Sequence, residues 1–398
     1  MNDELQACVQ FLQRLIQTPA IPGEESKIAR CVKEEMERLA YDSVWIDEAG
    51  NVIGQIEGEG RAPDVMFATH LDHVDIGPLG DWEIPPYEGQ VRKGKVWGRG
   101  AVDIKGPLAA QVYGVARLKR QGMRPPGHVY VVATVQEEIG GVGARYLMQH
   151  LRPPLVVVGE PSRNELRQGH RGRILYEVII QGRSAHASMP EQGINPLDTL
   201  GQFLLERFQF EAQENPKLGR TTVVPTLVRV DQTSSNVIPA KVWLALDCRN
   251  VPEQSRQDIF TQLNEILQRS LRGGASARLH IPVVEQRTYT GYTLRMAADN
   301  PPFLLPDEHP FLQAAQEVLR QRLNRRVPVG VWNFATDGGH FARAGLKVLG
   351  IGPGDDTLAH TANEHIDIAA IEEALHINEA LAMQVGIHYE TLRRRKAV

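Results

Sequence analysis

Five short segments, spread over most of the chain, carry side chains of the kinds that bind divalent metal ions. Their candidate metal ligands are His70, Asp103, Glu138, Glu160 and His360. Neutral imidazole nitrogens and carboxylate oxygens bind such ions, and a carboxylate has two oxygens with which it can bridge two cations. Paired cations lower the pKa of a water molecule and polarise a carbonyl group. The residue types therefore predict metal-assisted hydrolysis of an amide bond.

Each segment also has a plain structural explanation when it is taken alone. His70 fits a hydrogen-bonded polar residue at a strand end, and Asp103 fits a helix N-cap. Glu160 fits an ordinary loop residue, and His360 fits a surface histidine. The metal-site interpretation depends on the occurrence of all five segments in one chain, each after an apolar run.

A pair of adjacent carboxylates, Glu137 and Glu138, also follows an apolar run. Two carboxylates there repel each other and resist desolvation unless cations compensate them. We expect one to bind metal and the other to take a proton from the attacking water. The alternative is a pair of solvated glutamates at a loop tip. Asp72 is placed two residues after His70 to accept a hydrogen bond from its second ring nitrogen, or to stiffen the turn.

The elements that must position these residues are apolar strands. Apolar runs over residues 65–69, 129–135 and 155–158 end just before three of the candidate segments. Continuous apolar runs alternating with helices indicate a parallel sheet covered on both faces. In such sheets, ligand sites gather at the carboxyl ends of the strands. Two amphipathic helices are expected in the first forty residues.

The middle of the chain has a different pattern. Its expected order is strand 174–180, helix 196–210, strands 222–230 and 242–248, helix 257–271 and strand 277–284. This is the β-α-β-β-α-β order of the ferredoxin-like unit. We therefore expect an inserted α+β lid domain at 173–288 within a discontinuous α/β catalytic domain made of residues 1–172 and 289–398. Residues 286–310 are expected to form a long irregular connection.

The composition excludes several classes of function. The chain has 398 residues, 42% of them hydrophobic. Its formal net charge of −4 gives no electrostatic reason to expect nucleic-acid binding. No stretch approaches the roughly 18 apolar residues that span a bilayer, so we expect no membrane partner. Three cysteines, Cys8, Cys31 and Cys248, are too few and too uneven for a disulfide scaffold and favour reduced thiols in the cytoplasm.

The motifs around these residues resemble a known family. The chain is similar to the co-catalytic di-zinc hydrolases that include acetylornithine deacetylase, succinyl-diaminopimelate desuccinylase, aminoacylase-1 and the glutamate carboxypeptidases. The resemblance covers nearly the whole chain and is carried by residues 70–72, 98–106, 136–140, 159–161, 182–188 and 359–364. Residues 169–173 and 289–292 further resemble the branch that is linked in some bacteria to selenium metabolism.

The resemblance implies a role for each candidate. It implies two Zn²⁺ ions, for which Co²⁺ or Mn²⁺ can substitute, with Asp103 as the bridging ligand. The first ion would be held by His70, Asp103 and Glu160, and the second by Asp103, Glu138 and His360. Glu137 would be the general base, and Asp72 the hydrogen-bonding partner of His70.

The resemblance also implies roles for residues of the lid. In relatives, the histidine that matches His186 reaches the active site of a partner subunit and stabilises the oxyanion, which implies a homodimer formed through the lid domain. Asn236 and Arg249 match positions that contact substrate, and Arg171 is a further candidate for a substrate carboxylate. His186 also fits a turn residue, and Arg249 fits a salt-bridge former. Residues 336–340 match the family pattern only loosely.

The expected function is that of a metallohydrolase which deacylates a small N-acyl amino acid. A glutamate at the position of Glu160 accompanies deacylases among the relatives more often than peptidases. Two alternatives stay open: a carboxypeptidase or dipeptidase with the same metal site, and a non-catalytic binding homologue that keeps the fold.

Overall fold

The computed structural model describes residues 2–396, and they form two compact units. The first, called the α/β unit, contains the described residues up to 169, residues 286–294 and the described residues from 304 onward. The second, called the α+β unit, contains residues 170–285 and 295–303.

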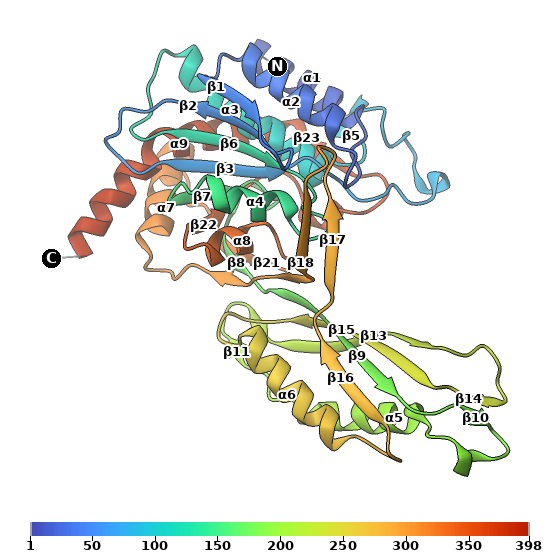
Figure 1. Ribbon diagram of the computed structural model, residues 1–398. Helices are drawn as coiled ribbons and strands as arrows, with labels where there is room; N and C mark the ends of the chain where they lie inside the picture. Colours follow the sequence, from blue (N-terminus) through green and yellow to red (C-terminus); the bar gives the residue numbers. More distant parts are fainter. Residues whose placement is uncertain (1, 397–398) are drawn as a thin grey trace. The chain divides into compact units, whose positions relative to one another are not determined.

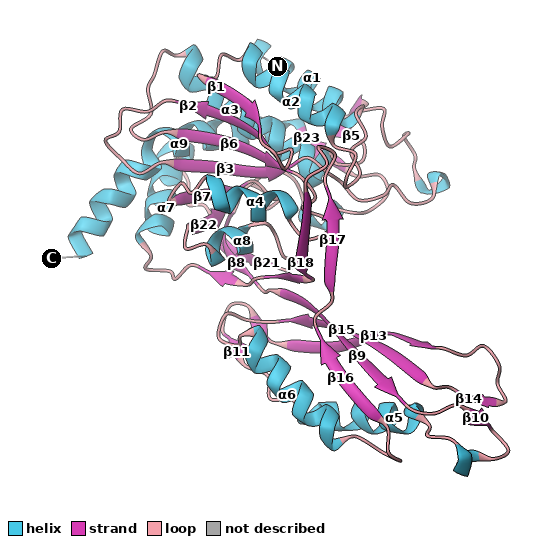
Figure 2. Cartoon of the chain, viewed as in Figure 1, coloured by secondary structure: helices cyan, strands magenta, loops and turns pink. Residues whose placement is uncertain are grey.

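The α/β unit is built of helices around one large sheet (Figures 1 and 2). Its helices are α1 (Asp3–Ile16), α2 (Ser26–Arg38), α3 (Gly106–Arg120), α4 (Val142–His150), α7 (Pro310–Leu323), α8 (Gly338–Arg343) and α9 (Ile368–Lys396). The strands of its large sheet are β1 (Ser43–Ile46), β2 (Val52–Ile56), β3 (Val65–His70), β6 (Val129–Thr134), β7 (Leu155–Val158), β8 (Leu166–His170), β20 (Phe303–Leu304), β21 (Val329–Trp332) and β22 (Lys347–Gly350). A small second sheet contains β4 (Val91–Arg92), β5 (Lys95–Trp97) and β23 (His365–Asp367).

The large sheet is mixed, with its parallel strands in the centre. The strand order is β1-β2-β6-β3-β7-β22-β8-β20, and β21 pairs with β8. The neighbours β6, β3, β7 and β22 run parallel, so their carboxyl ends lie at one edge. The flanking strands β2 and β8 pair antiparallel with this central group. The expected α/β class with a mixed, mostly parallel sheet is confirmed.

Alternate residues of the central strands pack against helices on opposite faces. Val65 and Phe67 of β3 belong to the main core, which also contains residues of α1, α2, α3, α7 and α9. Met66 and Ala68 are buried as well, on the face that β3 turns away from this core. Figure 1 shows α4 and α8 over that face. Burial on both faces is why these strands consist of unbroken apolar runs.

The α+β unit contains a five-stranded antiparallel sheet with helices on one face. Its main elements are β9 (Arg173–Gln181), α5 (Pro196–Glu206), β13 (Thr222–Val230), β15 (Lys241–Arg249), α6 (Arg256–Arg269) and β16 (Ser276–His280). Its short strands are β10 (Ala185–His186), β11 (Glu214–Asn215), β12 (Gly219–Arg220), β14 (Val237–Ile238) and β19 (Asp299–Asn300). The sheet order β13-β15-β9-β16 and the sequence of elements are those of the ferredoxin-like unit. Its core joins Leu244 of β15 to Phe203 of α5 and Leu263 of α6.

The expected irregular connection at 286–310 is wrong. The strand expected over 277–284 ends at His280, and β17 (Val283–Arg287) then pairs with β18 (Thr293–Ala297) as a hairpin. Pro282 separates the two strands, because proline has no backbone N–H to donate to a ladder. The hairpin turns at Gly291, whose φ is 93°. The domain limits also differ, since residues 295–303 belong to the α+β unit, in which β19 pairs with β9.

None of the helices in residues 2–396 combines the length and the apolar character that a membrane span requires.

Candidate metal centre

The candidate ligands lie where the four central parallel strands end. His70 is the last residue of β3, and Glu160 follows β7 by two residues. Glu138 follows β6, and His360 lies in the long segment after β22. Asp103 is in the turn Ala101–Lys105, which leads into α3. Because parallel strands present their carboxyl ends at one edge, segments far apart in sequence meet there.

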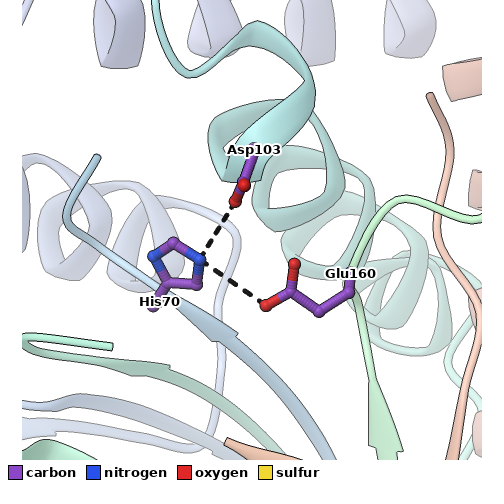
Figure 3. Close-up of side chains that lie close together, drawn as sticks. All are labelled: His70, Asp103 and Glu160. Carbon is purple, nitrogen blue, oxygen red and sulfur yellow. Dashed lines mark ion pairs between the residues drawn. The ribbon is translucent and has the colours of Figure 1, made fainter. Parts of the chain in front are cut away.

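These side chains form two groups that share Asp103. In the first group, His70 Nε2 lies 3.2 Å from Asp103 Oδ1 and 3.5 Å from Glu160 Oε1. Figure 3 shows the imidazole facing both carboxylates. In the second group, His360 Nε2 lies 3.1 Å from Asp103 Oδ2 and 3.1 Å from Glu138 Oε1. In each group one ligand atom from each of three residues lies within 4.8 Å of the others.

The electrostatics of both groups favour positive charge between the side chains. Burial raises the pKa of Glu160 well above its usual value, and the charge of Asp103 raises it further. Burial also raises the pKa of Asp103, but the close imidazoles of His360 and His70 outweigh this and bring it below its usual range. The pKa of His360 is raised to about 10, chiefly by its hydrogen bonds to Asp103 and Glu138. The desolvated carboxylates therefore favour a positive charge within each of the two groups.

The residues fit a pair of divalent cations. Asp103, His70 and Glu160 are buried, and His360 is half-exposed, so that the second group opens toward solvent. Asp103 Oδ1 is buried and accepts no hydrogen bond from any of residues 2–396, although it lies 3.2 Å from His70 Nε2. A buried carboxylate oxygen without a donor is well suited to a cation. Oxygen ligands with two imidazoles suit Zn²⁺, Co²⁺ or Mn²⁺.

Asp72 links the first group to the adjacent glutamates. The Nδ1 atom of His70 lies 3.0 Å from the backbone oxygen of Asp72 and 3.4 Å from its Oδ1. A proton on Nδ1 satisfies these oxygens and leaves Nε2 as the ligand atom. The carboxylate also accepts hydrogen bonds from the backbone N–H groups of Glu137 and Glu138, each at 3.1 Å. Asp72 therefore orients both the histidine and the loop that carries the glutamates, which is a wider role than the sequence indicated.

Glu137 is partly buried beside both groups. Burial raises its pKa well above the usual value, and the neighbouring carboxylates Asp337, Glu160 and Glu138 raise it further, while His70 opposes them. Two cations in the neighbouring groups would oppose this shift, because positive charge favours the carboxylate form. Glu137 is therefore a candidate for proton transfer at the edge of the two groups.

Two buried acids at this edge were not assigned a role from the sequence. Asp337 accepts a hydrogen bond from Thr134 Oγ1 at 2.7 Å, and burial raises its pKa to about 6. Glu25 accepts hydrogen bonds from the N–H groups of Gln136 at 3.2 Å and Gly23 at 3.0 Å. Glu25 directly precedes the amphipathic helix α2, a position at which acidic residues are ordinarily solvated. The loosely matching segment 336–340 was the one signal that pointed to Asp337.

A third buried acid, Glu364, was quoted from the sequence only as part of a motif. Its carboxylate accepts hydrogen bonds from the backbone N–H groups of Gly100, Val102 and Asp103 and from the side chain of Arg99. The position of Glu364, four residues after His360, is the signal that could have identified it.

The other four candidates lie in the α+β unit. His186 is exposed, and its Nδ1 accepts a hydrogen bond from the backbone N–H of Ser188 at 3.1 Å. Asn236 is also exposed, next to β14, which pairs with the strand that contains His186. Arg249 donates to Asp247 Oδ1 at 2.7 Å. The remaining candidate, Arg171, donates to the backbone oxygen of Arg220 at 3.2 Å. The structure thus gives both arginines partners within the unit.

Comparisons with known proteins give one matching family model, several relatives and similar folds. A model of the family described as Peptidase family M20/M25/M40 matches residues 66–384. The uncharacterized protein YgeY of Escherichia coli K12 is 28% identical over 361 residues, which are 89% of this chain and 88% of that protein. A succinyl-diaminopimelate desuccinylase of Halorhodospira halophila is 25% identical over 92% of this chain and 95% of its own. Among solved structures, aminopeptidase PepT from Bacillus cereus has a TM-score of 0.76 at 17% identity, covering 96% of this chain and 98% of the other.

Proposed function

Because the chain belongs to peptidase family M20/M25/M40, we propose that this metallohydrolase cleaves the amide bond of a small N-acyl amino acid at a centre of two divalent cations. One observation carries the proposal: two groups of ligand atoms share Asp103, beside Glu137. A desuccinylase among the relatives, which cleaves an N-succinyl group by its name, supports a deacylase.

The metal-binding residues follow from the two groups. His70, Asp103 and Glu160 would hold one cation, and Asp103, Glu138 and His360 the other. We propose Zn²⁺ for both, with Co²⁺ or Mn²⁺ as substitutes, because these ions accept mixed oxygen and imidazole ligands. Bound cations supply a polarised substrate carbonyl and a water molecule of lowered pKa.

Glu137 moves the proton in this reaction. Its carboxylate accepts the proton of the attacking water and then returns it to the nitrogen of the leaving amine. Asp72 holds the loop in place for this step, because its two oxygens accept the N–H groups of Glu137 and Glu138. The base and the neighbouring ligand are thus oriented by one buried carboxylate.

His186 is proposed as the donor to the oxyanion in a partner subunit. A backbone N–H can only donate, so the contact from Ser188 makes Nδ1 of His186 an acceptor, and the neutral ring carries its proton on Nε2. That N–H is the group an oxyanion requires. We propose a homodimer through the α+β unit, supported by its edge strand β13, whose exposed apolar residues are Val224, Leu227, Val228 and Val230. We propose that Asn236, Arg249 and Arg171 contact the substrate.

A second candidate function, a carboxypeptidase or dipeptidase with the same site, is favoured by the family description. A single screen separates the two. The protein is stripped of metal, loaded with Zn²⁺ or Co²⁺, and assayed against N-acetyl amino acids, N-succinyl amino acids and dipeptides. We expect two ions per chain and release of the acyl group. Turnover restricted to peptides would assign the peptidase, and two bound metals without turnover of any amide would indicate a binding homologue.

The three cysteines are free, in agreement with the proposed cytoplasmic location.

A further inference from the structure

A buried ion pair joins the segment of His360 to the segment of Asp103. Arg99 and Glu364 are 2% and 0% exposed, and their side chains meet at 2.8 Å between Nη1 and Oε2. Arg99 precedes the turn that carries Asp103, and Glu364 follows His360 by four residues. The pair therefore lies between two ligands that are far apart in sequence.

The carboxylate of Glu364 has donors on both oxygens. Its Oε1 accepts the backbone N–H groups of Val102 at 2.7 Å and Asp103 at 2.9 Å. Its Oε2 accepts the N–H of Gly100 at 2.9 Å in addition to Arg99. Three backbone N–H groups of one turn thus converge on one side chain of another segment. Such an arrangement fixes the path of the backbone up to the bridging ligand.

Arg99 extends the connection to the turn that carries His360. Its Nη1 also donates to the backbone oxygen of Thr361 at 3.1 Å, directly after His360. Its Nη2 donates to the backbone oxygen of Asp75 at 3.2 Å, in the loop that follows β3. One buried guanidinium therefore contacts the segments that follow His360 and His70.

The turn itself needs external support. His360 has a φ of 62° and Asn363 a φ of 61°, both in the left-handed region that residues other than glycine rarely adopt. The side chain of Asn363 accepts from the N–H of Glu83 at 2.7 Å and donates to the backbone oxygen of Asp81 at 3.0 Å. Glu364 then anchors the other end of the turn to the segment of Asp103.

We propose that Glu364 is a positioning residue that sets His360 against the bridging carboxylate of Asp103 and thereby determines the affinity of the second cation. The inference rests on the proposed metal centre. The second group contains two ligands whose segments Glu364 joins, Asp103 and His360, whereas the first group contains one. Loss of the Glu364 carboxylate therefore weakens the second site more than the first.

The substitution Glu364→Gln tests this with little change of shape. Glutamine presents one acceptor oxygen and one NH₂ group. The NH₂ group therefore faces N–H donors from which it cannot accept a hydrogen bond. Groups behind metal ligands typically change metal affinity by about 10- to 100-fold. The matched control is Asp367→Asn, an exposed carboxylate three residues further on, paired at 3.8 Å with Lys95. His360→Ala provides the reference for a chain that has lost the second site.

The measurement is calorimetric titration of the metal-free full-length chain with Co²⁺, together with the visible absorption spectrum of the bound ion. We expect two sites in the wild type and in Asp367→Asn. In Glu364→Gln we expect a first site weakened much less than the second, and a second site weakened about 10- to 100-fold. The first site should resemble the one that His360→Ala keeps. Two unchanged sites, or equal weakening of both, would overturn the inference while leaving the metal centre intact. Failure of the wild type to bind two ions would instead refute the proposed function.

A double variant covers the case in which Glu364→Gln does not fold. Arg99→Met with Glu364→Met removes both charges together, so no unpaired charge is left buried. The three backbone N–H groups still lose their acceptor, and we expect the same selective loss of the second site. Normal binding of two ions by the folded double variant would show that the carboxylate contributes to folding only.

Discussion

The carboxylate of Asp72 offers the sharpest test of how the site is held together. Its two oxygens accept the backbone N–H groups of Glu137 and Glu138, each at 3.1 Å, and its backbone oxygen lies 3.0 Å from Nδ1 of His70. The substitution Asp72→Asn keeps the shape and the backbone oxygen. It replaces one acceptor oxygen with an NH₂ group, so either Glu137 or Glu138 loses the acceptor for its N–H.

The size of the effect follows from that loss. A buried donor left without a partner costs about 1–3 kcal/mol, and a hydrogen bond to a charged group contributes about 1.5–3 kcal/mol. The affected N–H belongs to the loop that carries the proposed base and one proposed metal ligand. A loss of about 1.4–2.7 kcal/mol corresponds to about 10- to 100-fold, the usual range for groups behind metal ligands. We therefore expect activity or metal affinity to fall by that factor, while the contact of Nδ1 with the backbone oxygen preserves the tautomer of His70.

The assay compares kcat/KM and Zn²⁺ affinity of Asp72→Asn with those of the wild type and of Asp75→Asn. Asp75 is an exposed carboxylate in the same loop, and within the described residues its side chain accepts only one local hydrogen bond, from the N–H of Gly77. The control should behave as the wild type. An Asp72→Asn protein within about twofold of the wild type in both measurements would refute the reasoning, because a twofold change is far below the cost of one lost buried acceptor.

Three further predictions concern Glu137, His186 and Glu25. Glu137→Gln should keep both metals but lose about 10²- to 10⁴-fold in kcat, because general base catalysis contributes that much. Metal analysis and steady-state kinetics measure the two quantities. Full turnover would rule out the base assignment. Mixing inactive His186→Ala and Glu137→Gln chains should restore activity in mixed dimers, since one site then has both groups; no recovery in subunits shown to exchange would contradict supply across subunits. Burial raises the pKa of Glu25 from 4.5 to about 7, so the folded state binds a proton that the unfolded chain releases above pH 4.5. The contribution of Glu25 to the free energy of unfolding is present at low pH and is lost as pH rises to about 7. In denaturant titrations of the metal-free protein, Glu25→Gln should make this decline with pH less steep. Parallel curves of unfolding free energy against pH for the two proteins would exclude the effect.

Parts of the fold were predictable because they depend on short-range patterns. Strand β7 and residues 65–68 of β3 are apolar throughout, since helices cover both faces of the sheet, and such runs are visible in the sequence. Two polar residues, His70 at the end of β3 and Glu160 two residues after β7, were therefore predicted at the carboxyl edge. The hairpin of β17 and β18 was missed because its burial pattern is mostly exposed and so carries little hydrophobic periodicity.

The meeting of His360 with Asp103 could not be derived from spacing. The two residues lie in irregular segments, one in a left-handed turn and the other in a distorted turn before α3. The motif resemblance placed both in one site, but their atoms approach to 3.1 Å through contacts made by other residues. Glu364 makes those contacts, and a buried carboxylate cannot be distinguished from a solvated one by its residue type alone.

The sequence by itself determined which residues could do the chemistry, because carboxylates and imidazoles at the ends of apolar strands are visible residue by residue. It also determined the alternation of strands and helices, since that depends on local periodicity. Only the tertiary structure decided which carboxylates are placed to contact a cation and which accept hydrogen bonds from the backbone. Asp103 and Glu364 are both buried acids, and their roles differ because one leaves an oxygen without a donor while the other has donors on both oxygens. That difference arises from contacts between distant segments, which exist only once the chain is folded.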